Sequence, residues 1–331
     1  MRRRDLLAGA AVGIAARPAL AEIPGMDPRL PDGTRAVARM GSLPGKAPLI
    51  QLADRPPNYE APLSAFRTAI TPNDHFFVRY LLALIPDMEE LRDWKLEIGG
   101  EGAERNVTFT LAELQRDFPH AEVTAVCQCS GNRRGMFQPH VAGVEWGVGA
   151  MGNARWTGVR LRDVLDKAGV KGGAIEVAFN GADGGVFPAT PDFVKSIPVD
   201  KARDEHTMIA FEMNGKPLPA ANGFPARLIV PGWTGTYWMK QLTDLDIRTK
   251  PQGGFWMNPA YRVPAGRFPN ADAFATQATP ANTPITDIVV NSLVTSIRDG
   301  ERVHRGQTVE VAGIVWDGGR GIREVQVSSD A

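Results

Sequence analysis

The sequence predicts a mixed α+β protein, rich in β-structure, that ends in the start of an immunoglobulin-like β-sandwich. Strand-like runs outnumber helix-like runs and do not alternate with helices as βαβ units would. The 35 glycines and 26 prolines indicate many turns. After residue 284 the pattern changes to strand, turn, strand, which is typical of a sandwich domain.

Residues 1–21 have the order of an export signal. Arginines 2–4 precede a small apolar stretch from Leu6 to Ala16, and Ala19-Leu20-Ala21 forms an A-x-A cleavage site. Arg3-Arg4-Asp5-Leu6-Leu7 also fits the twin-arginine pattern, although a plain secretory signal with a chance arginine pair remains an alternative. We therefore expect a mature chain that begins near Glu22 and works in the periplasm.

The composition excludes several classes of protein. The chain has 331 residues, 43% of them hydrophobic, with 7 Trp and 14 Phe, so it has a core to bury and disorder is not expected. Lys+Arg and Asp+Glu both number 37, and the missing basic excess argues against nucleic-acid binding. No apolar run reaches the roughly 20 residues of a membrane-spanning helix.

The elements follow in order along the chain. Residues 22–70 are rich in proline and predict an irregular arm, and a catalytic body is expected over 71–280. Thr110-Leu-Ala-Glu113 is a capping box that opens a short helix ending before Pro119. A strand over 121–129 then leads to a Ser-Gly-Asn turn. Apolar residues at helical spacing over 161–168 predict a second helix that Gly169 terminates.

Further strands are predicted over 174–179, 207–213 and 226–230, with Asn214-Gly215 as a hairpin turn. After a passage rich in proline and glycine (250–284), strands are expected over 286–297, 308–316 and 322–328, with turns at Asp299-Gly300 and Gly318-Gly319. The sequence stops at Ala331, inside or just after a strand. We therefore expect the sandwich segment, residues 284–331, to be truncated.

Cys127 and Cys129 are the two cysteines of the chain. In an oxidising compartment a cysteine pair usually forms a disulfide, but a bond across one intervening strand residue would be strained. A metal-binding thiolate is the stronger interpretation. Arg133 and Arg134 follow closely, and arginine suits oxyanions, so a metal beside an anion explains both features. The structural alternative is a buried cysteine with two surface arginines.

The chain resembles the sulfite oxidase family of molybdenum enzymes, and most closely the bacterial cytochrome-linked sulfite dehydrogenases. The resemblance covers roughly residues 60–331. Its landmarks are His75-Phe-Phe-Val-Arg79, Gln128-Cys-Ser-Gly-Asn-Arg-Arg134, Ala154-Arg-Trp-Thr-Gly158, Leu161-Arg-Asp-Val-Leu165, Phe211-Glu-Met-Asn-Gly-Lys-Pro-Leu-Pro219, Gly223-Phe-Pro-Ala-Arg227, Val230-Pro-Gly232 and Lys240. Several motifs in one order are far more specific than any one of them.

This resemblance implies a molybdenum–molybdopterin cofactor with Cys129 as the metal ligand. It implies that a second set of positions holds the pterin and its phosphate: Phe77, Val78, Arg79, Tyr80, Leu81, Asp183, Asn222, Arg227, Trp238, Met239 and Lys240. Arg79 and Arg134 match arginines of the anion pocket, and Tyr261 matches a tyrosine that faces the metal-bound oxygen. Trp238 and Met239 as core residues, and Asp183 as a turn cap, are the structural alternatives.

The implied reaction is the oxidation of sulfite to sulfate by oxo transfer at molybdenum, with electrons leaving singly. Sulfite is a small dianion, so its site needs fixed positive charge in a partly dry pocket. The chain has no C-x-x-C-H motif, so no haem is expected in it and a c-type cytochrome is the expected acceptor. The resemblance also implies a homodimer through the C-terminal domain.

Two positions depart from the family pattern. After Phe-Phe-Val-Arg the family usually reads x-His, whereas this chain has Tyr80-Leu81. Asn222 stands where many relatives have histidine, although an amide can donate to a phosphate. Leu81 leaves room for another substrate, so a related enzyme acting on sulfane sulfur or a sulfoxide is an alternative. A non-catalytic anion-binding relative is another, although the presence of Cys129 speaks against it.

Two rival motifs are weaker. Gly147-Val-Gly-Ala-Met-Gly152 satisfies the dinucleotide-binding pattern G-x-G-x-x-G, but no βαβ unit surrounds it. Cys127, Cys129, His120 and His140 are residue types that bind zinc, yet their spacing is unusual for a zinc site and the arginine pair would repel the metal.

Overall fold

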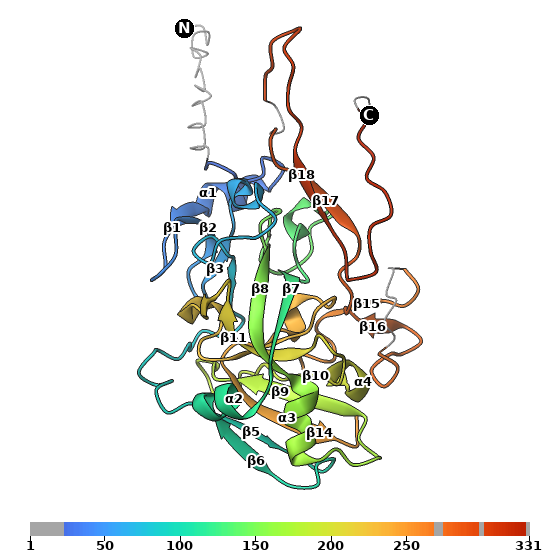
Figure 1. The fold of residues 1–331 in the computed structure, drawn as a ribbon. Coiled ribbons are helices and arrows are strands. Elements are labelled where there is room, and N and C mark those ends of the chain that lie inside the picture. Colours follow the sequence, from blue (N-terminus) through green and yellow to red (C-terminus); the bar gives the residue numbers. More distant parts are fainter. Residues whose placement is uncertain (1–22, 268–273, 298–300, 329–331) are drawn as a thin grey trace, which may run out of the picture.

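The computed structural model describes residues 23–267, 274–297 and 301–328, and three β-sheets form its body (Figure 1). The predicted export signal and the turn at Asp299-Gly300 lie outside the described residues. The fold is mixed and β-rich, as the sequence predicts, with four α-helices of at most eight residues and four short 3-10 helices in the described part. None of the helices within these ranges has the length and apolarity needed to cross a bilayer.

The first sheet is built mainly from the N-terminal arm and has the order β1-β2-β3-β4. Its strands are β1 (Arg39–Gly41), β2 (Leu49–Ala53), β3 (Asn58–Glu60) and β4 (Val78–Arg79). A helix α1 (Asp32–Val37) precedes it, and a 3-10 helix η1 (Leu63–Phe66) follows β3. The arm predicted as irregular over residues 22–70 therefore contains three strands, β1, β2 and β3. Its strand β3 pairs with β4, which lies after the arm in the sequence.

The second sheet has five strands in the order β10-β9-β14-β5-β6. These are β5 (Lys95–Gly99), β6 (Val107–Thr110), β9 (Glu176–Gly181), β10 (Lys195–Pro198) and β14 (Leu242–Arg248). The third sheet contains the two longest strands, β7 (His120–Gln128) and β8 (Met151–Arg160), with β11 (Met208–Met213), β12 (Lys216–Pro217) and, paired to β11, β13 (Arg227–Ile229).

The short helices begin and end where the sequence predicts. In α2 (Leu111–Asp117), Thr110 and Glu113 form the reciprocal capping box. In α3 (Leu161–Ala168), the buried positions follow the helical spacing and Gly169 closes the helix with φ 72°. Asn214 and Gly215 both have positive φ and join β11 to β12 in a hairpin. The helix α4 (Val199–Ala202) and the 3-10 helices η2 (Arg134–Met136), η3 (Ala220–Asn222) and η4 (Gly235–Tyr237) complete the set.

The C-terminal segment forms two hairpins. Strand β15 (Arg262–Pro264) pairs with β16 (Asn282–Pro284), and β17 (Asn291–Val294) pairs with β18 (Gly313–Trp316). The strand predicted over 322–328 is not formed. Figure 1 shows this segment running away from the body, where a strand has no neighbour to pair with, and Val325 and Val327 are exposed.

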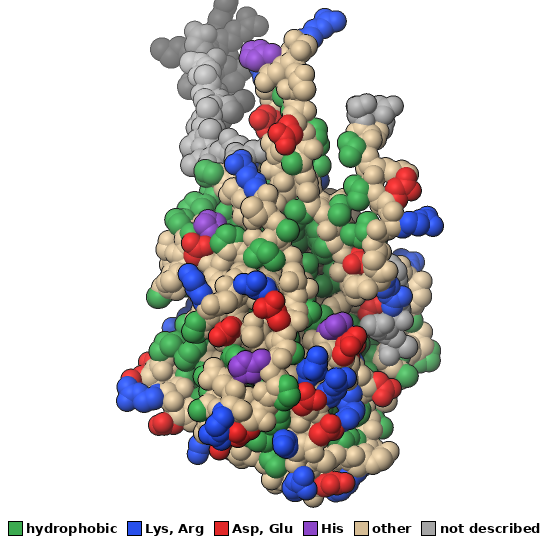
Figure 2. Space-filling view, viewed as in Figure 1, with side chains coloured by type: hydrophobic (Ala, Val, Ile, Leu, Met, Phe, Trp, Pro, Cys, Tyr) green, Lys and Arg blue, Asp and Glu red, His purple; other side chains and the backbone are tan. Residues whose placement is uncertain are grey.

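One large core joins the second and third sheets, and aromatic rings fill its centre. Trp156 meets Phe76 and Trp238 edge-on, with ring centroids 5.8 and 5.6 Å apart. Outside this core, Figure 2 shows acidic and basic side chains intermixed over the lower part of the face, around α2 and α3. A cavity inside the molecule is lined by residues from the end of β7, from β13 and from η4.

Candidate active site

Cys129 stands at the end of β7, on a tight turn that holds its sulfur in place. Its backbone N–H donates to Ala150 O (2.9 Å), and its carbonyl accepts from the Asn132 N–H (2.9 Å). The Gly131 N–H points at Cys129 Sγ at 3.4 Å and helps to fix the position of the sulfur. A β-carbon on Gly131 would meet the Arg134 guanidinium at 2.6 Å, so a larger residue there would displace the end of the arginine side chain.

The Cys129 side chain borders a cavity of about 70 Å³ inside the protein. The cavity is lined by Phe77, Arg79, Leu81, Cys127, Cys129, Ser130, Phe193, Arg227, Gly235, Thr236 and Tyr261. Both cysteines are free thiols, so the strained disulfide is not formed, as expected. Cys127 is buried, and its burial raises the pKa of the thiol to about 11.

Arg227 enters the cavity wall from β13 and is 4% exposed. Its guanidinium donates to the carbonyls of Asn222 (3.0 Å) and Trp238 (3.2 Å) and lies 3.8 Å from Cys127 Sγ. The carbon of the guanidinium is 5.2 Å from the Trp156 ring centre. Within the described ranges Arg227 Nε has no hydrogen-bond partner. Burial lowers the pKa of this arginine, since no carboxylate compensates its charge.

Arg79 is the last residue of strand β4 and lines the cavity. Some of its neighbours in sequence line the cavity as well, and others support its wall from behind. Arg79 donates to Asn58 Oδ1 at 2.9 Å and to the Tyr80 carbonyl. Phe77 and Leu81 line the cavity, whereas Val78 lies in the core of the arm sheet. The Tyr80 hydroxyl turns away and accepts from Gln241 Nε2 (3.0 Å), so Tyr80 supports the wall from behind.

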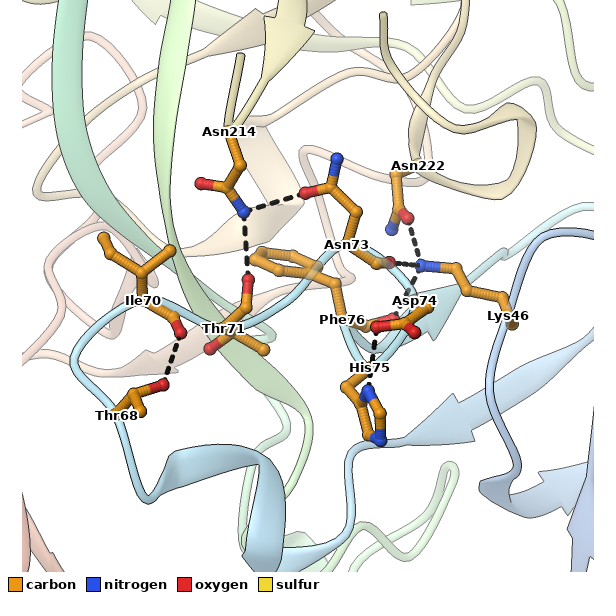
Figure 3. A network of polar contacts seen from close by, with 10 residues as sticks. All are labelled: Lys46, Thr68, Ile70, Thr71, Asn73, Asp74, His75, Phe76, Asn214 and Asn222. Atoms are coloured by element: carbon orange, nitrogen blue, oxygen red, sulfur yellow. Dashed lines mark hydrogen bonds and ion pairs between the residues drawn. The ribbon is translucent and has the colours of Figure 1, made fainter. Parts of the chain in front are cut away.

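Asn222 is a buried junction that connects three segments (Figure 3). Its Oδ1 accepts from Lys46 Nζ, its Nδ2 donates to the Phe77 carbonyl (3.1 Å), and its own carbonyl accepts from Arg227. Oδ1 and one Nδ2 hydrogen thus have partners inside the protein, and donation of the second Nδ2 hydrogen to a phosphate stays a prediction. Asn222 fixes Phe77 and Arg227 relative to each other.

Lys46 reaches this junction from the arm. Besides Asn222, its ammonium donates to the carbonyls of Asn73 (2.6 Å) and Phe76 (3.0 Å), as Figure 3 shows. All three acceptors are neutral, and burial lowers the pKa of Lys46 to about 7. No motif marks Lys46, which lies in the proline-rich arm, so sequence reasoning missed it.

Lys240 and Asp183 form a coupled pair beside Arg227. Desolvation raises the pKa of Asp183 and lowers the pKa of Lys240 well below its ordinary value, although each charge favours the ionised form of the other. Lys240 Nζ lies over the Tyr80 ring. Trp238 and Met239, which precede Lys240, are buried in the core, and Trp238 contributes its carbonyl to Arg227.

Tyr261 lines the cavity, whereas Arg134 is not among the lining residues, although its charge acts on the Tyr261 hydroxyl. Tyr261 has φ 57°, an unusual conformation for a bulky residue. Burial raises the pKa of its hydroxyl, and the positive charge of Arg79 opposes the rise. The Arg134 guanidinium donates to Val144 O (3.2 Å) and packs on Gly131. Arg79, Cys129, Arg227 and Tyr261 are thus brought together, and Arg134 supports the cysteine turn from outside.

The structure argues against the two rival motifs, the zinc site and the dinucleotide-binding glycine pattern. No three His, Cys, Asp or Glu residues cluster as a metal site in the part of the chain that the structure describes. The glycines of the 147–152 motif pack closely instead of opening a helix. Gly147 N–H donates to the buried Glu60 carboxylate at 2.7 Å, and a β-carbon on Gly149 would meet the Ala61 carbonyl at 2.0 Å.

The residues present fit the cofactor that the sequence predicts. The charge of Lys240 is compensated in part by Asp183. Three further basic side chains converge around or behind the cavity, and none forms a salt bridge with a carboxylate of the described residues: Lys46, Arg79 and Arg227. Buried charge without a partner is costly, so such a cluster indicates an anionic ligand such as a phosphate. A thiol at the same cavity supplies the soft ligand that a molybdenum centre accepts.

Comparison with known proteins identifies relatives of this arrangement. Residues 83–256 match the family described as oxidoreductase molybdopterin binding domain. The chain is 35% identical over 286 residues to the mitochondrial sulfite oxidase of Homo sapiens, covering 84% of this chain and 51% of that protein. It is 31% identical to the sulfite oxidase of Arabidopsis thaliana over 317 residues, covering 90% of this chain and 77% of that protein.

The fold is also similar to a solved structure, the sulfane dehydrogenase SoxCD from Paracoccus pantotrophus. The TM-score is 0.67 with 26% sequence identity, covering 87% of this chain and 68% of that one. This chain spans about half the length of the mammalian relatives it matches.

Proposed function

Because the chain belongs to the sulfite oxidase family of molybdopterin oxidoreductases, we propose that it oxidises sulfite to sulfate and passes the electrons singly to a c-type cytochrome. One observation carries this proposal: the Cys129 thiol borders a small cavity whose walls hold two arginines, and neither forms a salt bridge with a carboxylate of the described residues. A dianion needs this combination of fixed positive charge and exclusion of water.

Cys129, Arg227 and Lys240 would hold the molybdenum–molybdopterin cofactor, with Lys46 adding positive charge behind Asn222. When bound, the cofactor supplies oxygen-atom transfer and accepts two electrons. Overall, sulfite and water give sulfate, two protons and two electrons. The chain binds and orients the anion: Arg79 attracts it, and the Tyr261 hydroxyl donates a hydrogen bond to an oxygen in the cavity. Phe77, Leu81 and Phe193 exclude bulk water.

Replacing the predicted metal ligand tests this proposal. We expect Cys129→Ser protein to hold less than about a tenth of the wild-type molybdenum and to lose sulfite-dependent reduction of cytochrome c, because a neutral hydroxyl replaces the thiolate. Cys127→Ser is the matched control, two residues earlier on the same cavity wall, and should retain its metal. Full metal and turnover in Cys129→Ser would refute the assignment, and zinc in place of molybdenum would refute the reaction.

Oxidation of sulfane sulfur is the second candidate function. Leu81 places an apolar side chain on the cavity wall, where a neutral, larger sulfur group would be tolerated. The similarity to a sulfane dehydrogenase supports the same alternative. Steady-state assays with sulfite, with thiosulfate-derived sulfane and with methionine sulfoxide distinguish these candidate activities. A protein that contains molybdenum and turns over none of them would favour a binding role.

We also propose that the protein works in the periplasm after twin-arginine export, on the evidence of residues 1–21 alone. N-terminal sequencing of protein from the periplasmic fraction should begin near Glu22, and a start at Met1 would contradict export. A homodimer through the C-terminal segment is proposed as well, and sedimentation equilibrium should then give twice the chain mass.

A further inference from the structure

Lys195 is a buried lysine that the reaction outlined above does not use. It lies on β10, is 0% exposed, and donates to the Trp256 carbonyl at 2.7 Å. No carboxylate of the described residues forms an ion pair with it. Glu176 of the neighbouring strand β9 lies on the opposite face of the sheet, where it accepts from Ser196. The ammonium of Lys195 is therefore stabilised by something other than a counter-ion.

Two tyrosine rings take that place. Lys195 Nζ lies 4.8 Å from the ring centre of Tyr237 and 5.3 Å from the ring centre of Tyr261, within the range of cation–π contacts. Tyr237 is in the core, whereas Tyr261 lines the cavity beside Cys129. Trp256, whose carbonyl receives the Lys195 hydrogen bond, belongs to the same loop as Tyr261. Lys195 thus contacts both the ring and the loop of the cavity tyrosine.

We propose that Lys195 is a positioning residue that holds a positive charge against the Tyr261 ring and so strengthens the hydrogen bond that the Tyr261 hydroxyl donates to the substrate. This inference rests on the proposed function for the identity of the substrate, and the contact between Lys195 and the Tyr261 ring does not depend on it. A cation against the π-face withdraws electron density from the phenol, so the O–H becomes a better donor. That gain is largest when negative charge develops on the bound oxygen, which makes it an effect on turnover.

Charge on Lys195 also makes the effect depend on pH. Burial, with a smaller effect of Arg262, lowers its pKa to about 7. The ionisable groups that face it are Tyr237 of η4, Tyr261 and Arg262 of β15, and burial raises the pKa of both tyrosines. As the pH rises through 7, Lys195 loses its proton, the ring loses its cation, and turnover should fall.

The test uses holoenzyme labelled with 3-fluorotyrosine. The chain has four tyrosines, so four ¹⁹F signals are expected, and Tyr261→Phe assigns the one that matters. We expect the Tyr261 signal to move between pH 5.5 and 8.5 in the wild type and to stay still in Lys195→Met. Lys195→Gln keeps a donor for the Trp256 carbonyl without the charge, and should behave as Lys195→Met does. A signal that still moves in both variants would overturn the proposal.

Kinetics give the second measurement. At pH 6, Lys195→Met and Lys195→Gln should lower kcat for sulfite about tenfold with KM changed less than twofold, and the fall in kcat above pH 7 should vanish. Lys201→Met is the control, since Lys201 of α4 pairs with Asp204 just after the helix and makes no contact with either ring. Unchanged kcat and pH profile in the Lys195 variants would overturn the proposal. Absence of sulfite turnover in the wild type would instead overturn the proposed function, and the ¹⁹F result would still decide the role of Lys195.

Discussion

Single residues with unusual backbone conformations mark the site. Outside glycine, the described residues with positive φ are Arg133, Asn214, Gln241 and Tyr261. Asn214 forms a hairpin turn, where such a conformation is common. The other three flank functional groups: Arg133 lies in the cysteine turn, Gln241 follows Lys240, and Tyr261 lines the cavity. Strain of this kind persists where the surrounding structure holds a side chain in a required direction.

Leu81 places an apolar side chain on the wall of the cavity beside Cys129. We expect Leu81→His to raise kcat/KM for sulfite about tenfold at pH 6 and less at pH 8, because an imidazolium on the cavity wall attracts the dianion and loses its charge above its pKa. Steady-state kinetics at both pH values measure the effect. Leu84→His, three residues later and outside the lining, is the control. An unchanged kcat/KM would show that the wall at Leu81 does not contact the anion.

At the scale of elements, the C-terminal hairpin holds the cysteine turn from outside. Trp316 of β18 donates its indole N–H to Gln128 Oε1 at 2.6 Å, and Gln128 separates the two cysteines. Arg133 of the turn donates to the Ser292 carbonyl of β17 at 2.7 Å and lies 5.9 Å from the Trp316 ring centre. The turn that bears Cys129 is therefore fixed by an element about 190 residues away in sequence.

Removing that indole N–H tests the coupling. We expect Trp316→Phe to lower kcat/KM for sulfite about fivefold and to lower molybdenum content, since losing one such hydrogen bond costs about 1 kcal/mol and loosens the turn. Trp94→Phe loses a similar bond, from the indole to the Leu242 carbonyl at 2.8 Å, away from the cysteine turn. It should lower the melting temperature without changing kcat/KM. Equal kinetic effects in the two variants would argue against a specific clamp.

At the scale of the whole molecule, a buried carboxyl joins the arm to the catalytic body. Glu60 of β3 is 1% exposed, and it accepts from the Gly147 N–H in the segment before β8. Burial raises its pKa from 4.5 to about 8. Because the folded pKa is raised, the folded state holds the proton more tightly than the unfolded chain. Its stabilising effect is complete below pH 4.5 and is lost as the pH rises through 8.

Glu60→Gln should remove this dependence. Relative to the variant, the wild type should lose about 3 kcal/mol of its free energy of unfolding between pH 5.5 and 8, since each pKa unit corresponds to about 1.4 kcal/mol. Urea denaturation of both proteins at the two pH values measures the difference. The contributions of the other ionisable groups cancel, because they are the same in the wild type and in the variant. Glu205→Gln alters an exposed carboxyl and should show no such divergence. Parallel stability curves for wild type and Glu60→Gln would show that Glu60 does not bind a proton in this range.

Local structure and the chemical type of the site could both be predicted from the amino-acid sequence alone. Capping residues set α2, helical spacing and Gly169 set α3, and Asn214-Gly215 set a hairpin, because each depends on neighbours a few residues apart. The pattern around Cys129 similarly identified a thiolate beside basic groups, and its resemblance to a family identified the cofactor.

The set of side chains that share the cavity could not be predicted from the sequence and follows from the packing of the fold. The fold places Arg79 and Tyr261 with Cys129, bonds Arg134 to the Val144 carbonyl, holds Asn222 between Lys46 and Phe77, and buries Lys46 and Lys195. The physical reason is that burial and missing counter-ions are properties of packing between distant segments. A lysine in an apolar strand looks like any surface lysine until the rings around it are known.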